Sequence, residues 1–284
     1  MKVIGINTFL FTSPFTSESI GWLDKFASWG FDSVEIAIEN PEDIDAALVN
    51  KSLQKNKFRC DTVCGVMMTE RDLRGTSDQQ QSALKYLKGT MDVMQQIGAK
   101  MLVGPLYSSV GRADAVTDED YKSQWSTVVK HLKELCDYAK LKGLTLAIEP
   151  LNRFETDFIN TCAQGLKLIS DVNKDNLFIH LDTFHMNIEE KDPAAAIRKA
   201  GKKLGLLHAC GTDRGTPGND HTDWNKIVKA LKDINYDGQL VIESFTKEVK
   251  SIARAAAIWR DVEISGEEIA VKGLAFLRSI QNYK

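Results

Sequence analysis

The sequence predicts an α/β fold, a single (β/α)8 barrel or TIM barrel that takes up residues 1–284. Eight short apolar runs typical of buried parallel strands occur about every 30 to 40 residues, and segments with helical periodicity separate them. Strands that alternate with helices indicate a parallel sheet with crossover connections. No GxGxxG motif follows the first run, so a closed barrel is favoured over an open dinucleotide-binding sheet.

The predicted strands cover residues 2–7, 33–38, 58–66, 100–104, 144–149, 177–182, 204–209 and 239–244. The predicted helices cover residues 17–29, 42–55, 77–97, 118–142, 161–172, 191–202, 223–234 and 266–281. Helix 118–142 has the clearest apolar stripe, with acidic residues at its start and Gly143 after its end. A further helix over 249–261 is expected to cover the barrel mouth.

Composition and charge argue against several classes of protein. The net charge of −3 provides no basic field for nucleic acid. No run reaches the ~18 apolar residues of a membrane span, and the apolar start of the chain lacks a signal-peptide core and cleavage site. Five cysteines without a CxxC pair predict reduced thiols and a cytoplasmic protein.

Four consecutive predicted strands end on side chains that bind metals. The runs LTLAIE, LFIHLD, LGLLH and QLVIE end at Glu149, Asp182, His208 and Glu243. Because the carboxyl ends of barrel strands meet at one face, we expect these four side chains to lie together. Taken singly, each carboxylate is as readily explained as a helix cap, and a lone histidine as a core residue. Four in succession favour a shared site.

Three carboxylates and one imidazole form a hard, oxygen-rich ligand set. Such a set suits manganese or magnesium, with cobalt as a further candidate, whereas a Cys-rich zinc site does not fit. A shared cation would also offset the cost of burying Glu243 at the end of an apolar run. The ligand charge of −3 against +2 on the metal gives one carboxylate a reason to hold a proton, which is useful in acid–base catalysis.

Several stretches in combination resemble the D-tagatose/D-psicose (allulose) 3-epimerase family. They are EPLNRFET (149–156), LDTFHMNIEE (181–190), HACGTDRGTPG (208–218), and the run from VIES (241–244) through AIWRD (257–261). GFDSVEIA (30–37) extends the similarity over most of the chain. The resemblance implies a xylose-isomerase-like TIM barrel and a metal-dependent isomerase that inverts C3 of free ketoses such as tagatose, psicose, fructose or ribulose. It also implies a homodimer or homotetramer.

The same resemblance assigns roles to individual residues. Those that match the family's metal ligands, which usually hold manganese or cobalt, are Glu149, Asp182, His208 and Glu243. Those that match its sugar contacts are Glu155, His185 and Arg214. The residues themselves leave alternatives: Arg214 as a surface residue paired with Asp213 or Asp220, and Glu155 and His185 as groups that orient the ligands from behind.

Inversion at C3 of a ketose requires removal of the proton next to the C2 carbonyl and its return on the opposite face. A cation at O2 and O3 would polarise the carbonyl and stabilise the enediolate. One fixed base does not easily reach both faces, so two carboxylates are expected, one as base and one as acid. Glu149 and Glu243, from the fifth and eighth strands, are predicted to exchange these roles with the direction of reaction.

Aromatic side chains after the first and fourth strands are candidates for an apolar wall beside the far end of the sugar. They are Phe9, Phe11, Phe15 and Tyr107. Packing in the core is the alternative for all four. His180 shares a strand face with Asp182 and is expected to fill a layer of the barrel interior.

Other activities remain open at this point. An aldose–ketose or hydroxypyruvate isomerase would use the same enediolate and protonate a different carbon, and a sugar-phosphate 3-epimerase would place a phosphate on Arg214. An apurinic-site endonuclease shares the barrel but needs a multi-zinc cluster and a basic surface, which five histidines and an acidic balance disfavour. A non-catalytic carbohydrate-binding barrel would keep the metal without exchange of the C3 hydrogen.

Overall fold

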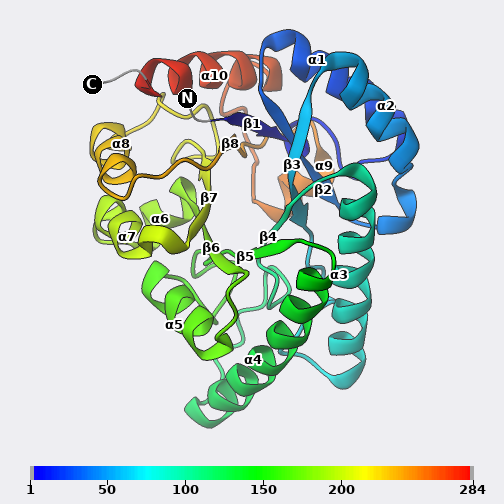
Figure 1. Cartoon of the computed structure of the whole chain (residues 1–284). Coiled ribbons are helices and arrows are strands. Elements are labelled where there is room, and N and C mark those ends of the chain that lie inside the picture. Colours follow the sequence, from blue (N-terminus) through cyan, green and yellow to red (C-terminus); the bar gives the residue numbers. More distant parts are fainter. Residues whose placement is uncertain (1–2, 282–284) are drawn as a thin grey trace.

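The structure, a computed structural model, describes residues 3–281 and is a closed barrel of eight parallel strands surrounded by helices (Figure 1). The strands pair in chain order, and β8 pairs with β1. They are β1 (Ile4–Asn7), β2 (Ser33–Ile38), β3 (Arg59–Gly65), β4 (Met101–Gly104), β5 (Thr145–Ile148), β6 (Leu177–Asp182), β7 (Leu204–Ala209) and β8 (Leu240–Ile242). The predicted (β/α)8 barrel is confirmed. Residues 1, 2 and 282–284 of the predicted domain lie outside the described residues.

The helices form the outer layer in Figure 1. They are α1 (Gly21–Trp29), α2 (Ala46–Asn56), α3 (Ser77–Ile97), α4 (Asp118–Leu141), α5 (Cys162–Val172), α6 (Thr183–Glu189), α7 (Pro193–Ala200), α8 (Trp224–Asp233), α9 (Lys250–Ala255) and α10 (Gly266–Gln281). Short 3₁₀ helices cover Thr8–Leu10, Ser17–Ile20, Pro41–Asp43 and Gly201–Lys203. Within residues 3–281, no helix combines the length and apolar character needed to cross a membrane.

The structure differs from the predicted helices at several places. The helix predicted over 42–55 begins only at Ala46, after the 3₁₀ helix Pro41–Asp43. The helix predicted over 17–29 is divided into the 3₁₀ helix Ser17–Ile20 and α1. The helix predicted over 249–261 ends at Ala255, and Ala257 has a left-handed backbone (φ 55°) that does not continue a right-handed helix. The short α6 was not predicted, and it begins where Asp182 Oδ1 accepts a hydrogen bond from the backbone N–H of Phe184 at 2.7 Å.

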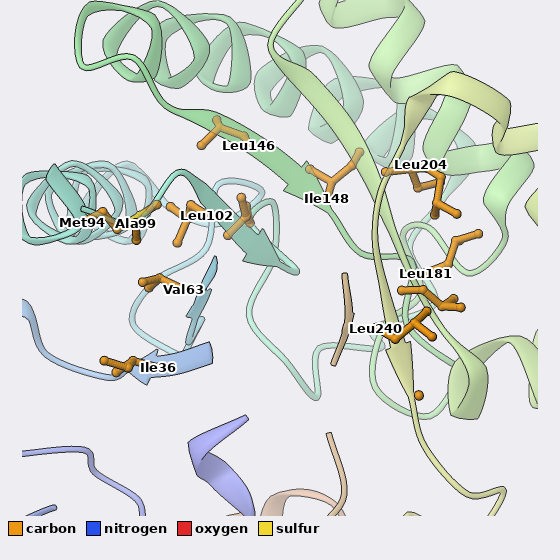
Figure 2. Close-up of a cluster of buried hydrophobic side chains, with 14 of the residues drawn as sticks. Ile36, Val63, Met94, Ala99, Leu102, Leu146, Ile148, Leu181, Leu204 and Leu240 are labelled. Atoms are coloured by element: carbon orange, nitrogen blue, oxygen red, sulfur yellow. The ribbon is translucent and has the colours of Figure 1, made fainter. Parts of the chain in front are cut away.

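Strand side chains alternate between the helix layer and the barrel interior. The outward residues belong to a large apolar core, which Figure 2 shows with Ile36, Val63, Leu102, Leu146 and Ile148 among its members. The inward residues form a second cluster of mostly smaller side chains, which includes Ala37, Val103, Ala147, Leu206 and Val241. At or just after the carboxyl ends of β5 to β8, the inward positions carry polar groups instead, so the chemistry is concentrated at one end of the barrel.

Candidate active site

The four predicted metal ligands meet at the carboxyl end of the barrel. Asp182 ends β6, His208 lies near the end of β7, and Glu149 and Glu243 directly follow β5 and β8. One ligand atom from each of the four lies within 4.8 Å of the others. All four residues are buried, with at most 6% of their surface exposed. Inward-facing positions on four neighbouring strands therefore bring together residues that are far apart in the sequence.

The atoms of this cluster are incompletely paired. Glu149 Oε1 and His208 Nδ1 are buried and have no hydrogen-bond partner among the described residues. Nδ1 of His208 lies 3.3 Å from Glu243 Oε2, without hydrogen-bond geometry. Arg214 Nη1 lies 2.7 Å from Asp182 Oδ2 and 3.3 Å from Glu243 Oε2. Three carboxylates thus share one arginine and one histidine, and the unpaired atoms fit a single bound cation.

Burial and neighbouring charge shift the two proposed acid–base carboxylates in opposite directions. Burial and the negative charge of Glu243 raise the pKa of Glu149 well above its ordinary value. Burial opposes ionisation of Glu243 as well, but the positive charges of His208 and Arg214 lower its pKa. Environments that separate the pKa values of two carboxyl groups are typical of an acid and base pair.

Arg214 and His185, both predicted sugar contacts, lie beside the four ligands. Arg214 is only 3% exposed, which excludes the surface-residue alternative, and its backbone is left-handed (φ 66°). Its guanidinium carbon lies 4.1 Å from the ring centre of Phe184 and 4.6 Å from that of Phe245. His185 Nε2 lies 3.1 Å from Arg214 Nη2.

His185 and Glu155 are both held by Asn152. The Asn152 backbone N–H donates to His185 Nδ1 at 3.0 Å, and the Asn152 side-chain amide donates to Glu155 Oε1 at 2.8 Å. His185 Nε2 lies 3.7 Å from Glu149 Oε1, so the ring stands between Arg214 and a proposed ligand. Burial raises the pKa of Glu155. Both side chains face the same space as the ligands.

A cavity of 490 Å³ opens above the cluster, within the size range of small-molecule sites. Glu149, Glu243, Glu155, His185 and Arg214 all line it. Asp182 and His208 are not among the lining residues, and they lie fully buried behind these groups. The cavity therefore has a polar, charged side where a cation and a reacting sugar carbon would meet.

The chain matches the xylose isomerase-like TIM barrel family over residues 23–280. It belongs to this family. The relatives that it resembles include "Probable ketose 3-epimerase" of Synechocystis sp. (35% identical, covering 96% of this chain and 95% of the relative) and L-ribulose 3-epimerase of Methylomonas sp. (32%, covering 88% and 87%). D-allulose 3-epimerase from Methylomonas sp., solved with D-allulose, has a TM-score of 0.92 at 29% identity and covers 99% of this chain and 97% of its own. The chain therefore belongs to the ketose 3-epimerases, a group of isomerases.

The apolar wall of this epimerase differs from the prediction. Phe9 lines the cavity as expected. Phe11 does not, because its ring stacks on Trp22 with a centroid separation of 4.3 Å, on the outer side of the barrel. Tyr107 is fully buried, and its hydroxyl donates to the backbone carbonyl of Glu149 at 2.8 Å. Phe15 belongs to the core. The apolar residues that do line the cavity include Leu151, Phe154, Phe245 and Ile252.

Polar residues of the epimerase that were not predicted lie beneath the ligands. Glu35 on β2 and Asn7 on β1 are fully buried, and Glu35 lies 2.8 Å from His208 Nε2. His180, expected to fill the barrel interior, does so with its ring centre 4.0 Å from that of His208. The signal for Glu35 was a carboxylate at an inward position of an apolar strand, SVEIAI. Glu35 lies three residues before the end of its strand, whereas catalytic residues of barrels usually lie at the strand ends.

Proposed function

We propose that this epimerase inverts C3 of a free ketose by proton transfer between the sugar and two carboxylates, Glu149 and Glu243, beside a divalent cation. The observation that carries the proposal is the cluster of four ligand atoms within 4.8 Å of one another at the polar side of the cavity. The opposite pKa shifts of Glu149 and Glu243 support their roles as acid and base.

The residues that would hold the cation are Glu149, Asp182, His208 and Glu243. Three oxygen ligands and one imidazole suit Mn²⁺ best, and Co²⁺ or Mg²⁺ are the alternatives. When bound, the cation supplies positive charge that favours the enolate form of the sugar over the ketone. The unpaired Glu149 Oε1 and His208 Nδ1 are the two atoms whose burial such an ion would offset.

The protein groups carry out the proton transfers. One carboxylate removes the C3 proton from one face. The electron pair of that C–H bond forms a double bond between C2 and C3, and the π pair of the C2 carbonyl moves onto O2 to give an enediolate. The other carboxyl group then donates a proton to the opposite face of C3, so the sugar gains and loses one proton. In the reverse direction, Glu149 and Glu243 exchange roles.

Glu155, His185 and Arg214 are proposed to bind the sugar hydroxyls and the carbonyl. All three line the cavity, and the contacts with Asn152 and Asp182 fix the positions of their polar atoms. Among the described residues that line the cavity, Arg214 is the single cation, and Asp182 and Glu243 already pair with it. A phosphate would find no free positive charge there, so an unphosphorylated ketose fits better.

The preferred ketose is proposed by analogy with the relatives. Their names include L-ribulose 3-epimerase and D-psicose 3-epimerase, at 30–33% identity to this chain. Ribulose and psicose are therefore the first sugars to test, followed by tagatose and fructose. A homodimer or homotetramer is a further prediction, which sedimentation velocity tests.

The deciding experiment incubates the protein and Mn²⁺ with each free ketose in D₂O. We expect a new ketose inverted at C3, resolved by chromatography, with deuterium at C3 in the product. Aldose formation with deuterium at C2 would instead indicate an aldose–ketose isomerase. A matched panel of ketose phosphates serves as the control for substrate class, and a strong preference for them would reject the proposal of free sugars.

A further inference from the structure

A fifth carboxylate lies inside the barrel, beneath the four proposed ligands. Glu35 occupies an inward-facing position in the middle of β2 and is fully buried. The strand is otherwise apolar or small, and an unpaired carboxylate in such a place is costly. Packing gives no reason for an acid here, so the groups that Glu35 contacts indicate its role.

The first contact is with His208. Glu35 Oε1 lies 2.8 Å from His208 Nε2, while Nδ1 of the same ring lies on the side of Glu243, 3.3 Å from Oε2. An ionised carboxylate only accepts hydrogen bonds, so Nε2 carries the hydrogen and donates it to Glu35. In the neutral ring this leaves the lone pair on Nδ1, the nitrogen that faces the other ligands.

The second contact runs through Asn7 at the end of β1. Its Oδ1 accepts a hydrogen bond from the backbone N–H of Phe9 at 2.9 Å, which fixes the orientation of the amide. Nδ2 therefore points into the barrel, where it lies 2.8 Å from Glu35 Oε1 and 3.2 Å from Glu243 Oε1. Glu35 is thus linked to two of the four proposed ligands.

We propose that Glu35 is a positioning residue for the cation site, which presents His208 through Nδ1 and, with Asn7, holds Glu243 in place. It does so from one layer below, without being one of the four ligands. A carboxylate that accepts the second N–H of a ligating histidine fixes the ring and makes the ligating nitrogen more basic. The inference rests on the cation site of the proposed function.

The test compares Mn²⁺ affinity in the wild type, Glu35→Gln and Thr62→Val. Mn²⁺ binding is followed by electron paramagnetic resonance of the unbound ion, without any activity assay. Glu35→Gln keeps the shape of the side chain and removes its charge, and we expect the dissociation constant to rise about 10- to 100-fold. Thr62 faces Glu35 across the β2–β3 register and is buried, and its Oγ1 has no hydrogen-bond partner among the described residues. Thr62→Val controls for disturbance of the same barrel layer and should bind Mn²⁺ like the wild type.

The outcomes separate this inference from the proposed function. If the wild type does not bind Mn²⁺, the cation site fails and the inference fails with it. If the wild type binds Mn²⁺ and Glu35→Gln binds it equally well, only the role of Glu35 is overturned. The same conclusion follows if Glu35→Gln lowers the metal-free melting temperature and leaves the dissociation constant unchanged, because that is the behaviour of a purely structural residue.

A second measurement uses the unaltered protein, in case Glu35→Gln does not fold. Nitrogen-15 NMR of the histidine rings, with Mg²⁺ as a diamagnetic cation, reports which nitrogen of His208 carries the hydrogen. We expect Nε2 to be protonated and Nδ1 to shift on addition of Mg²⁺. A shift of Nε2 instead, with the hydrogen on Nδ1, would contradict the proposed orientation.

Discussion

Two polar clusters, one buried and one partly buried, lie at the same end of the barrel, and they differ in charge balance. The ligand cluster (Glu149, Asp182, His208, Glu243 and Arg214) has three carboxylates for one arginine and one histidine, and it leaves polar atoms unpaired. The loop cluster (Asp72, Arg74, Arg112 and Asp157) has two arginines for two aspartates. Arg74 Nη2 lies 2.6 Å from Asp157 Oδ1, and Arg112 Nη1 lies 3.1 Å from Asp72 Oδ2.

This difference in charge balance distinguishes a cluster that stabilises the fold from one that is suited to bind a cation. The loop cluster ties together the segments after β3, β4 and β5, and nearby backbone bonds extend it to the cavity wall, such as Gly111 N–H to the Glu155 carbonyl at 2.7 Å. Each of its two aspartates pairs with an arginine, and Asp114, which also contacts Arg112, is exposed to solvent, so the cluster needs no further ion. The ligand cluster has an excess of negative charge, which a divalent cation would offset.

The largest expected effect is on catalysis, from removal of one acid–base carboxylate in the ligand cluster. Glu149→Gln or Glu243→Gln should lower the rate of C3 inversion by about 10²- to 10⁴-fold, because an amide does not exchange protons with the sugar. The rate is measured as deuterium incorporation at C3, and bound Mn²⁺ is measured in parallel because both residues are proposed ligands.

Asp114→Asn is the matched control for these variants. Asp114 pairs with Arg112 at the solvent-exposed edge of the loop cluster, 2.7 Å from its Nε, and should be dispensable for turnover. Near-normal turnover in both glutamine variants, at saturating Mn²⁺, would falsify the two-carboxylate mechanism.

The next effect is on stability, from the loop cluster. The side chain of Arg74 is fully buried, and its removal leaves Asp157 without a cation, so Arg74→Met should lower the free energy of unfolding by about 3 kcal/mol. Urea denaturation in the presence of EDTA measures this. Lys140→Met removes the cation of a solvent-exposed ion pair with Asp175 and should change the free energy of unfolding very little. Equal, small losses in both variants would show that the loop cluster does not hold the fold.

A somewhat smaller effect is expected from the cation itself. Mn²⁺ at a hundred times its dissociation constant should stabilise the protein by about 2.7 kcal/mol, and EDTA should reverse the gain. Arg74→Met should keep this increment, since its own cluster needs no ion, whereas Asp182→Ala should lose most of it. Thermal unfolding with and without Mn²⁺ measures the increment. If Mn²⁺ stabilises Asp182→Ala as much as it stabilises the wild type, the ligand cluster does not bind the cation, and the proposed difference between the two clusters is wrong.

The two clusters also differ in how far the sequence predicts them. The ligand cluster was predictable because each of its four ligands lies at or near a strand end, and the barrel brings strand ends to one face. Arg74 and Asp157 are 83 positions apart in irregular loops, where no periodicity indicates which side chains meet. The pairing of loop residues depends on the tertiary path of each loop, which the sequence pattern does not specify.

The direction of side chains in the loops was the second feature that the sequence did not predict. Phe11 and Tyr107 follow strands as Phe9 does, but Phe11 packs outward against Trp22, and Tyr107 packs against Phe158 in the large apolar core. Beyond the strand end the alternation of faces is lost, so the distance from a strand does not tell which side chain reaches the cavity. Glu35 shows the opposite case, because its inward position followed from the strand alternation, while its contact with His208 depended on closure of the barrel, which brings the unpaired strands β2 and β7 together.

The smallest expected effect is the pH dependence of the loop cluster. Burial opposes ionisation of Asp157, but the hydrogen bond and charge of Arg74 outweigh it and lower the pKa of this carboxyl below its ordinary value. A carboxyl group with a lowered folded-state pKa adds stability above its unfolded pKa of about 3.9, and this stability is lost as the pH falls through the folded value.

The free energy of unfolding of metal-free wild type should therefore exceed that of Asp157→Asn most at pH 6, and the difference should shrink at pH values below about 4. Urea denaturation of both proteins in EDTA across this range measures the difference. Titration of the ligand cluster affects both proteins alike and cancels, since Asp157 shares no contact with those residues. A difference that stays constant down to pH 3 would mean that the charge of Asp157 adds nothing, and that Arg74 holds the loops through its neutral contacts with Gln124 and Ser108 instead.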